Sequence, residues 1–165
     1  MNTAKLIING KTYEVQLTDE QVTEIEKPKK VTGFERVEEG ESCFSIDATG
    51  TIYSRNEYFE VLYNNANYYS DETLVEWCNR NDTLNRKMRR WAAEHNATPI
   101  DWTNEFPYKY HLYYDFGSET VEAYQSGTYC RTACCYFNTL PIAKAAVEKF
   151  GDEIKWLAEN RPKWF

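Results

Sequence analysis

The chain has 165 residues, of which 26 are acidic and 19 are basic, so its net charge is −7. This length suits one ordinary domain that buries about 70% of its unfolded surface, and such a core forms without disulfide or metal staples. The negative charge disfavours a bulk electrostatic grip on nucleic acid, and the sequence shows neither a secretory signal nor a run of about 20 apolar residues. We therefore expect a cytoplasmic protein without a membrane partner.

The N-terminal residues predict a small ββα element. Apolar side chains alternate on both sides of Asn9-Gly10, which suits the tight turn of a hairpin over residues 5–17. Thr18 and Gln21 have the spacing of a capping box, and the helix that they start ends before Pro28. We expect this element over residues 1–27, a linker over 28–33 and a main domain over 34–165.

The first half of the main domain predicts strands followed by a long helix. Residues 42–46 and 51–54 flank a turn at 47–50, residues 58–63 read as a third extended run, and two aromatics, Tyr68 and Tyr69, close the sheet. From Ser70 to about His95 the apolar period changes to that of a helix. The predicted buried stripe is Leu74, Cys78, Leu84, Met88, Trp91 and Ala92.

The second half repeats this order. Residues 108–115 and 120–124 flank a turn at 116–118, and residues 134–137 read as a further strand. Asn138 or Thr139 caps the closing helix, and Pro141 suits its first turn. The predicted buried stripe of this helix is Ile142, Ala146, Phe150, Ile154 and Leu157.

A shift of about 68 positions superimposes the two halves. Asp47 then falls on Asp115, and Tyr68-Tyr69 falls on Tyr136-Phe137. Such self-similarity is typical of a duplicated unit. The predicted fold class is therefore α+β: an antiparallel sheet built from two hairpin-helix units, at about 34–96 and 105–160, with the helices on one face.

Tyrosine is the main candidate for partner binding, because 13 tyrosines exceed what a core of this size requires. Alternation along a strand places rings on both faces, and an exposed tyrosine ring offers rigid contact area to a protein partner. The alternative is that cross-strand ring pairs only stabilise the sheet. The candidates are Tyr108, Tyr110, Tyr113, Tyr114 and Tyr124.

Two charged clusters are further candidates. The acidic run Glu38, Glu39 and Glu41 surrounds Gly40 and is either a solvated turn or an imitation of phosphates toward a basic partner. The basic cluster lies on the predicted long helix and is either a solvated face or a phosphate-binding patch for nucleic acid. Its members are Arg80, Arg86, Lys87, Arg89 and Arg90.

The sequence predicts neither a metal centre nor a catalytic site. The odd set of five cysteines indicates reduced thiols that act mostly as small core residues. Cys130, Cys134 and Cys135 lack the second pair that a zinc site requires, although His95 and His111 exist elsewhere. Glu94, His95 and Asp101 can be drawn as a dyad with a third group, but no catalytic motif is present. We expect a protein that is not an enzyme and has no cofactor.

Several stretches resemble a widespread family of small phage and prophage proteins of Gram-positive bacteria. They are residues 17–21, 33–41, 63–71, 84–96, 100–104 and 109–110 with 113–115. The resemblance implies a mobile-element origin, and small acidic phage proteins without catalytic motifs commonly occupy a surface on a host protein.

The leading hypothesis is therefore a counter-defence inhibitor of the anti-CRISPR type, which binds a host immune nuclease. The alternatives are a nucleic-acid-binding accessory protein and a structural or assembly factor.

Overall fold

The computed structural model of the chain describes residues 2–26, 31–56, 60–103, 106, 108–126 and 135–163. The chain divides into two compact units, Met1–Thr32 and Gly33–Phe165. Among the described residues, no helix combines the length and the apolar character that crossing a bilayer requires.

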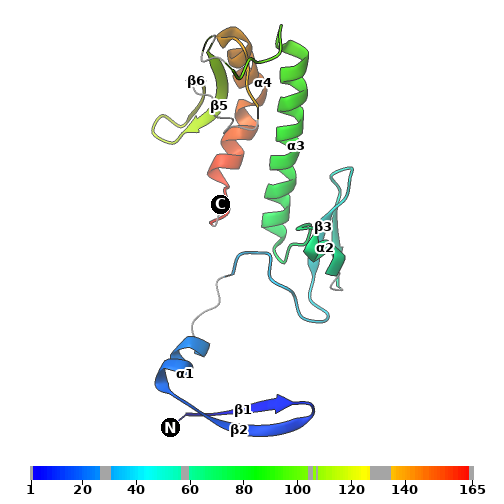
Figure 1. Cartoon of the computed structure of the whole chain (residues 1–165). Coiled ribbons are helices and arrows are strands. Elements are labelled where there is room, and N and C mark those ends of the chain that lie inside the picture. The colour runs from blue at the N-terminus through cyan, green and yellow to red at the C-terminus, as the bar shows by residue number, and fades with distance from the viewer. Residues whose placement is uncertain are drawn as a thin grey trace. The chain divides into compact units, whose positions relative to one another are not determined.

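The N-terminal unit is the predicted ββα element (Figure 1). Strands β1 (Asn2–Ile8) and β2 (Lys11–Leu17) pair antiparallel. The turn between them has φ of 51° at Asn9 and 76° at Gly10, and a primed turn requires a positive φ at both positions.

The capping box of helix α1 (Asp19–Glu26) is also confirmed. The Gln21 N–H donates to the Thr18 hydroxyl at 3.2 Å, and the Thr18 N–H donates to the Gln21 side-chain oxygen at 3.0 Å.

The main unit begins with the hairpin of β3 (Cys43–Ile46) and β4 (Ile52–Arg55), as predicted. Asp47 shapes the turn, since its carboxylate accepts the Thr49 N–H at 2.8 Å and the Thr51 N–H at 2.9 Å. A hydrogen bond from the Thr49 hydroxyl, together with these backbone bonds, lowers the Asp47 pKa to about 2.

The expected third extended run at 58–63 is wrong where the structure describes it. Residues 60–64 form the short helix α2 (Glu60–Asn64), while residues 58 and 59 lie outside the described residues. The helix ends in a Schellman motif: Ala66 has φ 53°, its N–H donates to Tyr63 O at 3.0 Å, and the Asn67 N–H donates to Leu62 O at 2.9 Å. Local capping bonds thus override a short run of aromatic and aliphatic residues.

Helix α3 (Glu72–His95) is the longest element, as predicted. Asp71 caps it by accepting the Leu74 N–H at 2.7 Å. The predicted stripe is buried except at Cys78, which is half-buried, and Val75, which the prediction omitted, is fully buried.

The second half contains β5 (Lys109–Asp115), β6 (Thr120–Ser126) and α4 (Leu140–Glu159). Thr139 caps α4. The strand expected at 134–137 is reduced to a single bridge between Phe137 and Tyr110, and residue 134 lies outside the described residues.

The two halves of the main unit place equivalent residues in equivalent roles, which supports the predicted duplication. Asp47 and Asp115 each head a hairpin turn with hydrogen bonds to backbone N–H groups. Buried aromatics bridge to the preceding hairpin in both halves, as Tyr69 does with Phe44 and Phe137 with Tyr110.

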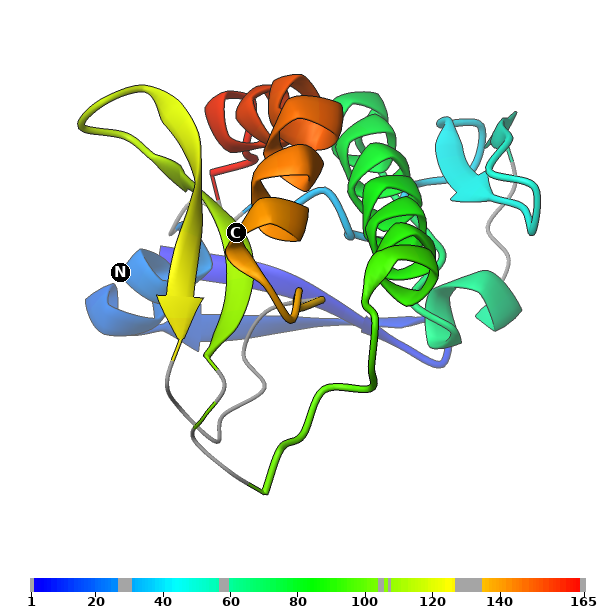
Figure 2. The ribbon, with the colours of Figure 1, turned by 90° about the horizontal axis from the view of Figure 1, so that it is seen from above.

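The α+β class is confirmed, but the strands do not merge into one sheet. Within the described residues they form three two-stranded sheets, of which two belong to the main unit. The Asn67 side chain pairs with both backbone groups of Ile46, at 2.9 Å and 2.6 Å, where a further strand would continue the ladder. The β3–β4 hairpin contacts α3, and the β5–β6 hairpin contacts α4 (Figure 2).

Helices α3 and α4 lie side by side and antiparallel over the main core (Figures 1 and 2). Phe137, Ala143 and Ala146 are fully buried in this core, and Leu112 and Ala123 of the β5–β6 hairpin pack against it. A second, smaller core lies under the β3–β4 hairpin around Tyr69, Leu74 and Val75.

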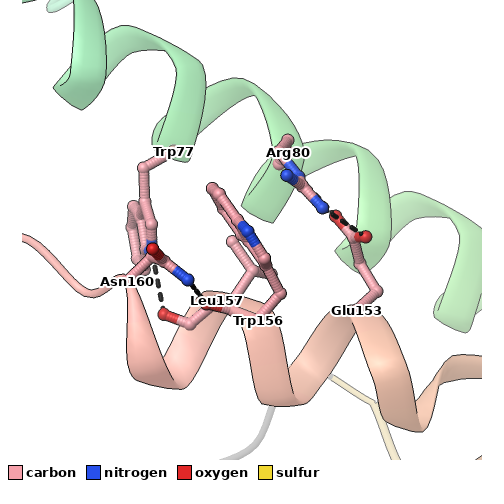
Figure 3. A network of polar contacts seen from close by, with 6 residues as sticks. All are labelled: Trp77, Arg80, Glu153, Trp156, Leu157 and Asn160. Carbon is pink, nitrogen blue, oxygen red and sulfur yellow. Dashed lines mark hydrogen bonds and ion pairs between the residues drawn. The ribbon is translucent and has the colours of Figure 1, made fainter.

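Polar contacts fix the seam between the two helices (Figure 3). The Trp77 indole N–H donates to Leu157 O at 2.9 Å, which satisfies a carbonyl in the last turn of α4. Arg80 forms a two-pronged pair with Glu153 at 2.9 and 2.8 Å, and its guanidinium carbon lies 3.4 Å from the centre of the Trp156 ring.

We expect Glu153→Gln to lower the free energy of unfolding by about 1 kcal/mol at neutral pH, since the pair is only partly buried. The hydrogen bonds from Arg80 hold the Glu153 pKa below its usual 4.5. The stabilisation is therefore fully present above that usual pKa and is lost as pH falls through the folded pKa. Urea unfolding of both chains from neutral to acidic pH tests this, and a difference that does not shrink in acid contradicts it.

Candidate interaction surface

The β5–β6 hairpin has two chemically different faces. Leu112 pairs with Ala123, and both pack against the core. One residue along each strand, Tyr113 pairs with Glu122, and His111 pairs with Tyr124. Because side chains alternate along a strand, these residues lie on the face away from the core, which we call the outer face.

Five rings form a continuous series of contacts across the outer face, which we call the aromatic ladder. Neighbouring ring centres are 5.0 to 5.8 Å apart, and their planes are tilted or perpendicular, as aromatic pairs prefer. In order, the members are Trp102, Tyr136, His111, Tyr124 and Tyr113.

The ladder runs from the interior to the surface. Tyr136 is 5% exposed, whereas Tyr124 is 56% exposed. The Tyr124 ring nevertheless has two ring neighbours on the adjacent strand β5. Its centre lies 5.5 Å from that of His111 and 5.8 Å from that of Tyr113. A large exposed ring is thus packed against two neighbouring rings of the hairpin.

Two polar side chains of β5, Lys109 and His111, lie on the same side of the strand as the ladder. Lys109 is 2% exposed, and its ammonium lies 6.0 Å from the centre of the Trp102 ring. Burial lowers the pKa of His111, which favours the neutral form of its imidazole. Within the described part of the chain, its Nδ1 atom is buried and has no hydrogen-bond partner.

Carboxylates accept hydrogen bonds from two tyrosines of the hairpin, Tyr113 and Tyr114. The Tyr113 hydroxyl donates to Glu122 at 3.1 Å, which raises the Tyr113 pKa. The Tyr114 hydroxyl donates to Glu159 of α4 at 2.9 Å, and burial together with this bond raises the Tyr114 pKa to about 12. Tyr113 therefore belongs to the outer face, and Tyr114 joins the hairpin to the helix.

The structure separates the five predicted tyrosines. Tyr113 and Tyr124 lie in the aromatic ladder, and Tyr108 lies just before β5, 37% exposed and 4.7 Å from the Phe106 ring. Tyr110 instead packs against the core, and Tyr114 contacts α4. The tyrosine rings therefore occupy both faces of the β5–β6 hairpin, and only some of the five predicted tyrosines face away from the core.

The acidic run forms an exposed turn. The Glu41 N–H donates to Glu38 O at 3.1 Å, and the Glu41 carboxylate accepts the Glu38 N–H at 3.1 Å. Gly40 supplies the positive φ of 91° that this turn requires, and Glu39 is exposed. One of the three carboxylates thus caps its own turn.

The basic cluster does not form one patch of unpaired cations. Arg80 is engaged by Glu153 and Trp156, and Arg90 pairs with Glu94 at 2.9 Å. Arg86 donates to the Thr83 hydroxyl at 3.1 Å. Lys87 and Arg89 are exposed.

The sequence prediction omitted three members of the aromatic ladder, namely His111, Tyr136 and Trp102. It also omitted Lys149, which lies close to the basic cluster of α3. His111 has the same strand parity as Tyr113, and Tyr136 occupies the repeat position of the buried Tyr68, so these signals existed. Nothing in the local sequence marked Trp102. Lys149 of α4 approaches the α3 cations only in the folded chain.

Three of the five cysteines lie within the described residues. Cys43 is buried, and Cys78 and Cys135 are half-buried, while Cys130 and Cys134 lie outside the described residues. Within the described ranges, no three His, Cys, Asp or Glu side chains are placed to hold a metal ion.

Comparison of the chain with protein-family models, curated proteins and solved structures finds no match.

Proposed function

We propose that this chain is a non-catalytic accessory protein that binds a protein partner through the outer face of β5–β6. The observation that carries the proposal is the aromatic ladder, which presents the 56% exposed ring of Tyr124 packed against the rings of His111 and Tyr113. Tyrosine is enriched among the few interface residues that dominate binding energy, because it offers a large amphipathic area at low entropic cost.

The surroundings of Tyr124 suit such an anchor. The Tyr113 hydroxyl and its Glu122 partner provide polar groups beside the ring. Aromatic centres surrounded by polar groups are typical of protein interfaces.

The partner class in this proposal is a host immune nuclease, and the activity is counter-defence inhibition of the anti-CRISPR type in the host cytoplasm. This finer statement depends on the resemblance to phage and prophage proteins. The net charge of −7 agrees with it, since an acidic surface favours approach to the basic surfaces with which nucleases hold nucleic acid.

Tyr124→Ala tests the proposal. The unaltered protein is expected to restore the plating of a targeted phage on a CRISPR-protected host and to retain a nuclease effector in a pull-down. The substitution is expected to weaken this binding by about 2 kcal/mol or more, if the ring is the anchor, and so to reduce both readouts.

Tyr53→Ala is the matched control, because Tyr53 is 43% exposed and lies on the other hairpin of the main unit. It is expected to leave plating and retention unchanged. Failure of the unaltered protein to restore plating and to retain an effector overturns the partner class. Equal losses in both variants overturn the assignment to the outer face.

A further inference from the structure

A groove runs along the seam between α3 and α4, on residues that the proposed function does not use. It consists of two cavities of about 590 and 240 Å³. Both are lined by Lys87 of α3 and by Lys149 and Phe150 of α4, so they adjoin one another.

The groove carries a local positive charge in an acidic chain. Four cations and two carboxylates line it, and both carboxylates are already engaged: Glu153 by Arg80 and Glu94 by Arg90. Lys87 and Lys149 are exposed, and neither forms an ion pair with another described residue. The excess charge thus comes from two lysines on opposite walls.

The floor of the groove is apolar. Leu84 and Phe150 line the larger cavity, and Trp91 joins Phe150 in the smaller one. The two rings are 8% and 7% exposed, so their faces are covered by the core. Nucleic-acid sites that bind single strands stack bases on open ring faces, and this floor offers none.

We propose that the α3–α4 groove binds an acidic amphipathic peptide segment of a protein partner. Carboxylates of the segment contact Lys87 and Lys149, and its apolar side chains lie against the alkyl stems of these lysines and the small exposed parts of Leu84 and Phe150. The charge complementarity favours an anionic occupant, and the lack of open ring faces disfavours a single-stranded nucleic acid. This surface is separate from the outer face, so the two proposals are tested independently.

The experiment measures fluorescence anisotropy with two labelled probes. One is a short peptide with leucine at every third or fourth position and glutamate between, and the other is a single-stranded oligothymidine. We expect the peptide to bind the full chain, and Lys87→Gln/Lys149→Gln to weaken that binding by about tenfold or more. Higher salt is expected to weaken it as well.

The control is Lys5→Gln/Lys144→Gln, which makes the same change in net charge at two exposed lysines outside the groove. It is expected to retain peptide binding within about twofold. Circular dichroism of all variants shows that they are folded, as exposed substitutions rarely affect stability. Preferential binding of the oligothymidine, absence of peptide binding, or equal losses in both double variants overturns the proposal.

Discussion

A chain carrying Phe137→Ala is expected to lose about 3–5 kcal/mol of unfolding free energy. Phe137 is fully buried, and its ring lies 5.7 Å from that of Trp91 on α3. Its backbone exchanges two hydrogen bonds with Tyr110, at 2.7 and 2.9 Å, which join the β5–β6 hairpin to the segment before α4. Truncation therefore leaves a cavity where both helices and the hairpin meet. Urea unfolding followed by tryptophan fluorescence measures the loss.

Phe116→Ala is the matched control in the same half of the chain. Phe116 is 68% exposed, and its one ring contact within the described part of the chain is with Tyr114, at 4.9 Å. Its truncation is expected to cost about 1 kcal/mol or less. Comparable losses in the two variants would mean that the position of Phe137 in the core does not determine its contribution.

The elements that sequence reasoning predicted are those set by local bonds. The turn at Asn9-Gly10 and the capping box of Thr18 and Gln21 depend on residues within a few positions of each other. The internal repeat added a comparison between distant segments, because a shift of about 68 positions aligns Asp47 with Asp115. Both carboxylates bind the backbone of their own turn, so the same local chemistry occurs twice.

The errors have one local and one long-range cause. Residues 58–63 are rich in the aromatic and aliphatic residues that favour a strand, yet the local Schellman bonds of Ala66 and Asn67 close a helix over residues 60–64. The Asn67 side chain then pairs with the backbone of Ile46 in β3, which ends the β3–β4 sheet on that side. Asn67 lies 21 residues from Ile46 in the chain, and its side-chain amide takes the place of a neighbouring strand. Such a contact leaves no periodic signal in the sequence.

Strand alternation made part of the candidate surface predictable. Strand alternation places Tyr113 on one face and Tyr114 on the other, so parity alone indicated an outward ring. It did not show that Tyr110 packs against the core or that Trp102 joins the aromatic ladder from a loop. Those contacts arise from tertiary packing, which neither composition nor periodicity encodes.

Gly33 occupies a position where both backbone geometry and space exclude a side chain. Its φ is 88°, and an added Cβ would lie 2.5 Å from Leu74 Cδ2 and 3.2 Å from Asp71 Cβ. Its carbonyl also accepts the Ser70 N–H at 2.7 Å, so the chain cannot move away without losing that bond. This close approach brings the start of the main unit against the first turn of α3.

We therefore expect Gly33→Ala to lower the free energy of unfolding by about 2–4 kcal/mol, because left-handed strain and steric overlap add. Gly40→Ala separates the two causes, since Gly40 has nearly the same φ, 91°, but no atom within 4 Å of an added Cβ. It is expected to cost about 1–2 kcal/mol from strain alone. Urea unfolding of both variants gives the difference. Equal losses would show that the segment around Gly33 relaxes away from α3, so that packing against Leu74 does not constrain it.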